Sequence, residues 1–99
     1  MFKFTAFFAQ ATGTLALLQS RDIAPHVQDH AIDMLGATAS DLSGTGGGEP
    51  HFADLAIAGD NYLVARKAGN PLLREQMEYL SVLKDTIAAL SQLALAEVK

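Results

Sequence analysis

The stretch KAGNP, residues 67–71, constrains the fold more than any other part of the sequence, because it ends one helix and immediately begins another. Gly69 is typical of the position just after a helix, where the backbone turns left-handed. Asn70 is a favoured N-cap, and Pro71 suits the first helical turn, where its missing N–H has no intrahelical partner to lose. A connection this short predicts that the two helices pack as an antiparallel hairpin.

The segments on both sides of this connection have helical periodicity. Over about 51–68, apolar residues at helical spacing define one face, with acidic residues near the start and basic residues in the last turn, as the helix dipole favours. Over about 71–97, apolar residues repeat every seven positions, which is typical of a helix packed against another helix. The first face consists of Phe52, Leu55, Ala56, Gly59, Tyr62 and Leu63, and the repeat of Leu73, Leu80, Ile87 and Ala94, interleaved with Leu83 and Leu90.

The N-terminal half predicts two more helices. In the first, the stripe formed by Phe4, Phe7, Phe8, Ala11, Leu15 and Leu18 favours a helix over a strand, although residues 2–8 also alternate. The second runs over about 23–42, with Asp22 as N-cap and Pro25 in the first turn. The glycine-rich segment 43–50 then separates the halves. It is interpreted as a linker rather than a phosphate-binding loop, because no strand precedes it and no Gly-Lys-Ser/Thr ends it.

These elements predict one all-α domain over 1–99, built as an up-down-up-down four-helix bundle. Its two helical hairpins cover 3–42 and 50–97, and residues 43–50 join them. The hydrophobic fraction is 49%, but only 7% of the residues are aromatic. Alanine and leucine therefore supply much of the apolar content, which suits closely packed helices.

Charge and cysteine content exclude several classes of protein. The formal net charge is −4 and the seven Lys and Arg residues never cluster, so a phosphate-binding stripe for nucleic acid is not expected. Without cysteine there are no disulfides and no thiolate metal sites; this fits a reducing compartment, and we expect a cytoplasmic protein. The uninterrupted apolar stretch before Gln10 is shorter than the roughly 7–15 residues of a secretory signal, so we favour a helix of the domain over a cleaved signal there. No apolar run approaches the roughly 18 residues of a membrane span.

The last predicted helix carries a second apolar stripe, about 100° or more around the helix from the first. Two stripes imply either a central position in the fold or a face offered to another chain. In a chain this short we favour the second, and expect a non-enzymatic interaction or assembly protein that self-associates or binds a partner helix. The expected partner-binding residues are Tyr79, Val82, Ala89, Leu93 and Ala96.

Two histidines one helical turn apart, His26 and His30, suggest a different function. With Asp33 they form a possible set of ligands for zinc, nickel or copper, so a metal-binding or metal-sensing protein is the alternative. A second His-x-x-Asp pair, His51 and Asp54, can contribute only if the packing brings it close. No other cofactor is expected.

A solvated helix face is the simpler interpretation of the histidines, because exposed His–Asp combinations are common. A helical wheel places Asp29 on this polar side as well. The opposite, buried side is then expected to consist of Val27, Ala31, Met34 and Leu35.

Catalysis has little support in the sequence. No Gly-x-Ser-x-Gly elbow is present. The paired carboxylates Glu75 and Glu78 are expected on the exposed side of the last helix, where general acid catalysis is not expected. We therefore expect the chain not to be an enzyme.

Overall fold

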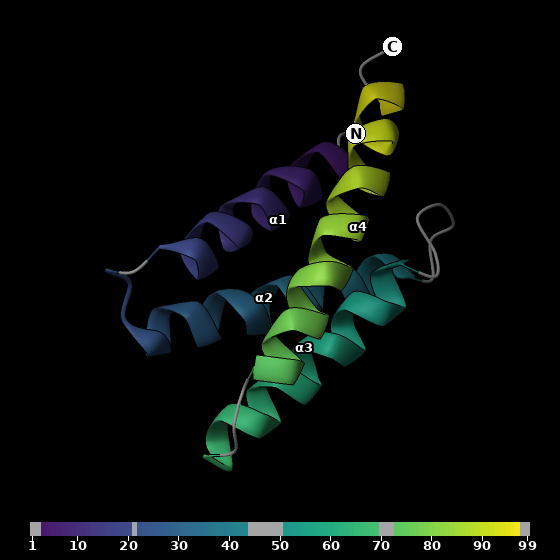
Figure 1. Cartoon of the computed structure of the whole chain (residues 1–99). Coiled ribbons are helices and arrows are strands. Elements are labelled where there is room, and N and C mark those ends of the chain that lie inside the picture. Colours follow the sequence, from purple (N-terminus) through teal and green to yellow (C-terminus); the bar gives the residue numbers. More distant parts are fainter. Residues whose placement is uncertain (1–2, 21, 44–50, 70–72, 98–99) are drawn as a thin grey trace.

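The computed structural model describes residues 3–20, 22–43, 51–69 and 73–97, and these ranges form four helices without a strand (Figure 1). The all-α prediction is confirmed, and the strand alternative for the N-terminal segment is wrong. The helix boundaries lie within two residues of those expected from the sequence. The helices are α1 (Lys3–Gln19), α2 (Pro25–Ser43), α3 (His51–Lys67) and α4 (Leu73–Glu97).

The helices form a closed ring in which α1 packs against α2, α2 against α3, α3 against α4, and α4 against α1. Successive helices run in opposite directions (Figure 1), which confirms the up-down-up-down arrangement. The last turns of α4 extend past the beginning of α3 and lie beside the start of α1. None of the helices in the described ranges is both long enough and apolar enough to cross a membrane.

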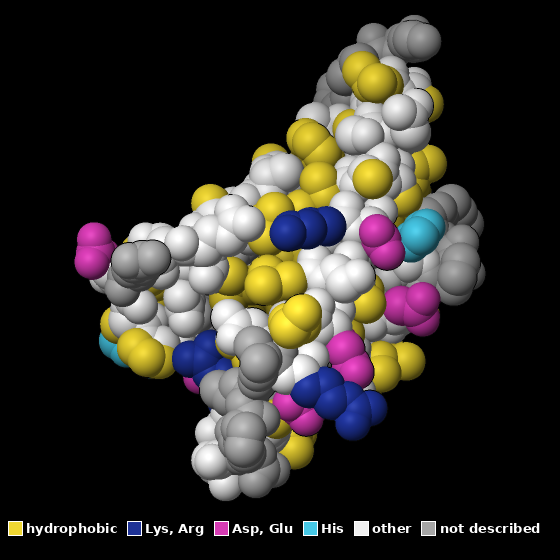
Figure 2. Space-filling view, in the orientation of Figure 1, with side chains coloured by type: hydrophobic (Ala, Val, Ile, Leu, Met, Phe, Trp, Pro, Cys, Tyr) yellow, Lys and Arg dark blue, Asp and Glu magenta, His cyan; other side chains and the backbone are white. Residues whose placement is uncertain are grey.

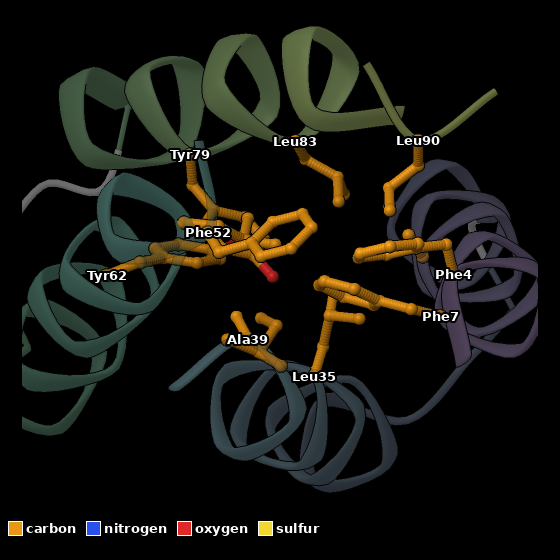
Figure 3. Packing of buried hydrophobic residues seen from close by; sticks show 12 residues of the cluster. Phe4, Phe7, Leu35, Ala39, Phe52, Tyr62, Tyr79, Leu83 and Leu90 are labelled. Atoms are coloured by element: carbon orange, nitrogen blue, oxygen red, sulfur yellow. The ribbon is translucent and has the colours of Figure 1, made fainter. Parts of the chain in front are cut away.

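Aromatic rings fill the centre of the bundle, and all four helices contribute to it (Figure 3). Phe52 of α3 contacts two rings from α1, with centroids 5.0 Å from Phe7 and 6.0 Å from Phe4. Toward the other end, Tyr62 stacks on Tyr79 of α4 at 5.7 Å. Burying a large apolar side chain contributes about 1.5–3 kcal/mol. The largest fully buried aliphatic side chains are Ile32, Leu35, Leu55, Leu83 and Leu90.

Two helix ends can be compared with the sequence prediction. Gly69 has φ of 72°, and its N–H donates to the Arg66 carbonyl at 3.2 Å, as expected of a residue that ends a helix. Asn70 and Pro71 lie outside the described residues. At the start of α2, the Ala24 carbonyl accepts hydrogen bonds from Val27 and Gln28. Ala24 is therefore the N-cap, and the expectation that Asp22 fills this position is wrong.

The buried face of α2 differs from the predicted one. Leu35 is buried as expected, but Val27 and Met34 are 40% and 49% exposed. The buried face is centred on Ile32, Leu35 and Ala39 instead. The predicted face is wrong because it followed Val27, Ala31 and Met34 and left out Ile32, whereas packing between α1 and α3 buries the side of α2 that reaches the aromatic centre.

A buried threonine lies at the centre of the packed face of α4. Thr86 is fully buried, and its hydroxyl donates to the Val82 carbonyl at 2.8 Å. A hydroxyl satisfied within its own helix can enter a core without an unpaired polar atom. The apolar stripes on either side of Thr86 are consequently two flanks of one face, which α4 uses to pack between α1 and α3.

Glu97, at the end of α4, caps the beginning of α1. Its carboxylate accepts the backbone N–H groups of Phe4 at 3.0 Å and Thr5 at 2.8 Å, and also the Thr5 hydroxyl at 3.0 Å. The first turn of α1 has no acidic residue of its own, so Glu97 also supplies the negative charge that favours a helix N-terminus. Partial burial would raise the pKa of Glu97, but these hydrogen bonds outweigh it and hold the pKa below its usual value.

Candidate interaction surface

The residues expected to face a partner from α4 have different environments. Tyr79 is fully buried and stacked on Tyr62, so the prediction that it contacts a partner is wrong. Val82 and Leu93 are half-buried against the core. Ala89 is half-buried, and Ala96 is exposed. The part of this flank that remains accessible therefore increases toward the end of α4.

A second apolar surface lies on the outside of α3, where the sequence prediction placed none. Ile57 and Val64 are 59% and 66% exposed, although both are large aliphatic residues. They are seven residues apart, so they lie two turns apart on the same side of the helix. This seven-residue spacing is visible in the sequence, but both residues fall outside the predicted buried face of the helix, so periodicity alone assigns them to solvent.

Ile57 and Val64 line a groove between α3 and α4. Two adjoining hollows of about 390 and 440 Å³ share Asn61 and Glu78, so together they form one open groove along the helix pair. We call it the α3–α4 groove. Its lining residues are Asp54, Ile57, Ala58, Asn61, Val64 and Ala65 from α3, and Arg74, Glu75, Glu78, Ser81 and Val82 from α4.

The charged side chains of the α3–α4 groove are mostly acidic. Asp54, Glu75 and Glu78 outnumber the single cation, Arg74, whose Nε lies 3.2 Å from a Glu78 carboxylate oxygen. Figure 2 shows acidic side chains among hydrophobic ones over α3 and the neighbouring part of α4. The groove therefore offers apolar contacts between walls of net negative charge.

Outside the α3–α4 groove, a polar cluster connects α2 and α3. Arg66 Nε lies 3.1 Å from Asp29 Oδ1, without the alignment of a hydrogen bond, so the contact is an ion pair. The same guanidinium lies over the Tyr62 ring and donates to the Tyr62 hydroxyl at 3.3 Å. Asp29 therefore lies at the edge of the α2–α3 interface, where its side chain is 41% exposed and pairs with the largely buried Arg66. Asp29 lies one turn before the buried Ile32, and this spacing is the feature of the sequence that could have indicated its place at the interface.

The histidines predicted as metal ligands are placed on the surface. His26, His30 and Asp33 are all exposed. Within the described ranges, no group of three or more His, Cys, Asp or Glu side chains is arranged to hold a metal ion. Beside His30 and Asp33, a shallow hollow of about 280 Å³ also contains Lys67, whose charge opposes a bound cation.

The second His-x-x-Asp pair does not complete this set. Because α2 and α3 run antiparallel and Asp29 pairs with Arg66, the start of α2 lies beside the end of α3. His51 and Asp54 are at the beginning of α3, and therefore at the opposite end of the helix pair. The packing separates the two His-x-x-Asp pairs.

Comparisons of the chain with models of protein families, with curated proteins and with solved structures found no match.

Proposed function

We propose that this chain is a non-enzymatic helical interaction or assembly protein, and that it self-associates through the accessible flank of α4. The observation that carries the proposal is the extension of α4 beyond α3 (Figure 1). On these last turns Leu93 is only half-buried, while Leu95 and Ala96 are exposed. A second copy of this helix end can cover the same residues.

The driving force is removal of leucine and alanine surface from water, about 25 cal/mol per Å². Association also costs translational and rotational freedom, and stable complexes usually bury about 800 Å² on each partner. The end of one helix offers less than this. We therefore expect reversible self-association that depends strongly on protein concentration.

Light scattering over a concentration series tests the proposal. The wild-type mass should rise with concentration, whereas Ala96→Glu should remain a monomer because the new carboxylate would be buried in the interface. Ala88→Glu is the matched control, since it makes the same change at an exposed position two turns earlier and about 80° around α4 from Ala96. A wild-type mass that stays monomeric throughout, or an equal effect of both substitutions, would overturn self-association through this flank.

A further inference from the structure

We infer that the α3–α4 groove binds a basic amphipathic helix from another protein. This inference deepens the proposed function, because it rests on the chain acting through helix–helix contacts. It concerns a different surface from the end of α4, however, so the two can fail separately.

The length of the groove suits a short helix. On α3 it runs from Asp54 to Ala65, which corresponds to roughly 17 Å at about 1.5 Å per residue. A partner helix of about three turns covers this distance. Helices that dock in grooves present apolar residues at positions i, i+3 or i+4, and i+7. The two-turn separation of Ile57 and Val64 matches such a series.

The depth of the groove also favours apolar anchors. Val82 forms part of its floor and packs against the hydrophobic core, so an apolar side chain entering between the helices extends the existing core outward. Ile57 and Val64 are on the α3 wall. Covering Ile57 and Val64 removes from water the largest exposed aliphatic side chains of α3.

Charge determines which kind of helix fits. Asp54, Glu75 and Glu78 lie along the walls, and Arg74 is already paired with Glu78. Lysine or arginine residues flanking the apolar stripe of the partner therefore meet complementary charge, which raises the association rate and disfavours acidic partners.

A second copy of this chain is a poor occupant of the groove. Among the described residues, α2 has no lysine or arginine, and no helix has more than two. The chemistry of the groove thus points to a partner whose helix is basic.

Fluorescence anisotropy with labelled synthetic helices tests this inference. One peptide carries leucine at i, i+4 and i+7 with flanking lysines, and the other has glutamate in place of every lysine. The 99-residue chain should bind the lysine peptide at least ten times more tightly, and this preference should decrease with added salt. Equal affinity for both peptides would overturn the proposed charge selection.

Matched substitutions then locate the binding site. Ile57→Ser/Val64→Ser should weaken lysine-peptide binding at least tenfold. Val27→Ser/Met34→Ser should leave it unchanged, because these residues of α2 are also exposed and seven positions apart but lie outside the groove. Equal losses in both variants would show that the peptide binds elsewhere.

Light scattering of the same variants shows whether the α3–α4 groove holds a basic helix or a second copy of this chain. Ile57→Ser/Val64→Ser should retain the concentration-dependent mass of the wild type, because self-association is assigned to the end of α4. If this variant instead becomes monomeric while the wild type associates, the groove holds a second copy and the inference is wrong. If the wild type is monomeric but binds the lysine peptide at the groove, only self-association fails.

Discussion

Replacing Tyr79 with phenylalanine should stabilise the protein, although tyrosine lies at the centre of the core. The Tyr79 ring is buried and stacked on Tyr62, and phenylalanine preserves this packing. The Tyr79 hydroxyl is buried without a hydrogen-bond partner among the described residues. Burying an unsatisfied polar group costs about 1–3 kcal/mol. We therefore expect Tyr79→Phe to raise the free energy of unfolding by about 1 kcal/mol.

The matched control is Tyr62→Phe, which removes a hydroxyl that accepts a hydrogen bond from Arg66. This variant should lose about 0.5–1.5 kcal/mol, the usual net contribution of one hydrogen bond. Thermal and urea unfolding measure both changes, and about 1 kcal/mol corresponds to about 4–8 °C in Tm for a domain of this size. If Tyr79→Phe is destabilised as much as Tyr62→Phe, the hydroxyl is satisfied in solution and the reasoning is refuted.

Titration of the tyrosines provides an independent measurement. Burial, and to a smaller extent the neighbouring Tyr62, raises the pKa of Tyr79 far above its usual value of 10.0. The folded state therefore holds the Tyr79 proton more tightly than the unfolded state does. The resulting stability is fully present below about pH 10 and is lost as pH rises further. Tyrosinate absorbance should show Tyr79 ionising only when the chain unfolds, and Tyr79→Phe should reduce this alkaline loss of stability.

Three further predictions concern the helix cap, two glycines and the histidines. Because folding lowers the pKa of Glu97, its contribution to stability is present above about pH 4.5 and is lost as pH falls through the lower native value. Glu97→Gln should therefore be less stable at pH 7 and should show a flatter decline in Tm with acid. An unchanged acid profile would contradict the cap. Gly36→Ala should raise the free energy of unfolding by about 0.5–1 kcal/mol, because a Cβ there meets nothing within 4 Å. Gly59→Leu should destabilise the protein, because even a Cβ at this position comes within 3.4 Å of side chains from α2 and α4. Equal urea midpoints for the two variants would refute this contrast. Zinc in excess should leave the Tm of chelator-treated protein unchanged, since His26 and His30 have no third ligand arranged beside them in the described ranges; a clear rise would support the metal-binding alternative.

The features of the fold that were predictable from the sequence depend on local chemistry. Gly69 ends α3 because glycine tolerates the left-handed backbone that the position requires. The predicted faces of α1 and α3 include Phe7 and Phe52, whose rings meet in the core, because helical periodicity alone places them on the inner side. Such signals need no knowledge of the neighbouring helices.

The sequence predictions are wrong where the environment of a residue depends on a neighbouring helix. Helical periodicity predicts two separate stripes on α4 and assigns Tyr79 to a partner-binding face. In the structure Thr86, hydrogen-bonded to the Val82 carbonyl, is buried between these stripes and joins them into one wide face. The ion pair of Asp29 was not predictable, because its partner, Arg66, is far away in sequence and comes close only through the packing of α3 on α2. The α3–α4 groove was missed for the same reason, since a groove belongs to two helices and appears in the sequence of neither.

The contact between Glu97 and the first turn of α1 has a consequence for how the molecule opens. Glu97 is hydrogen-bonded to Phe4 and Thr5, which lie 93 and 92 positions earlier in the chain. Neither the start of α1 nor the end of α4 can therefore fray without disturbing the other. Amide protons at the beginning of α1 should thus exchange with solvent together with those at the end of α4, and substituting Glu97 should accelerate exchange at both places.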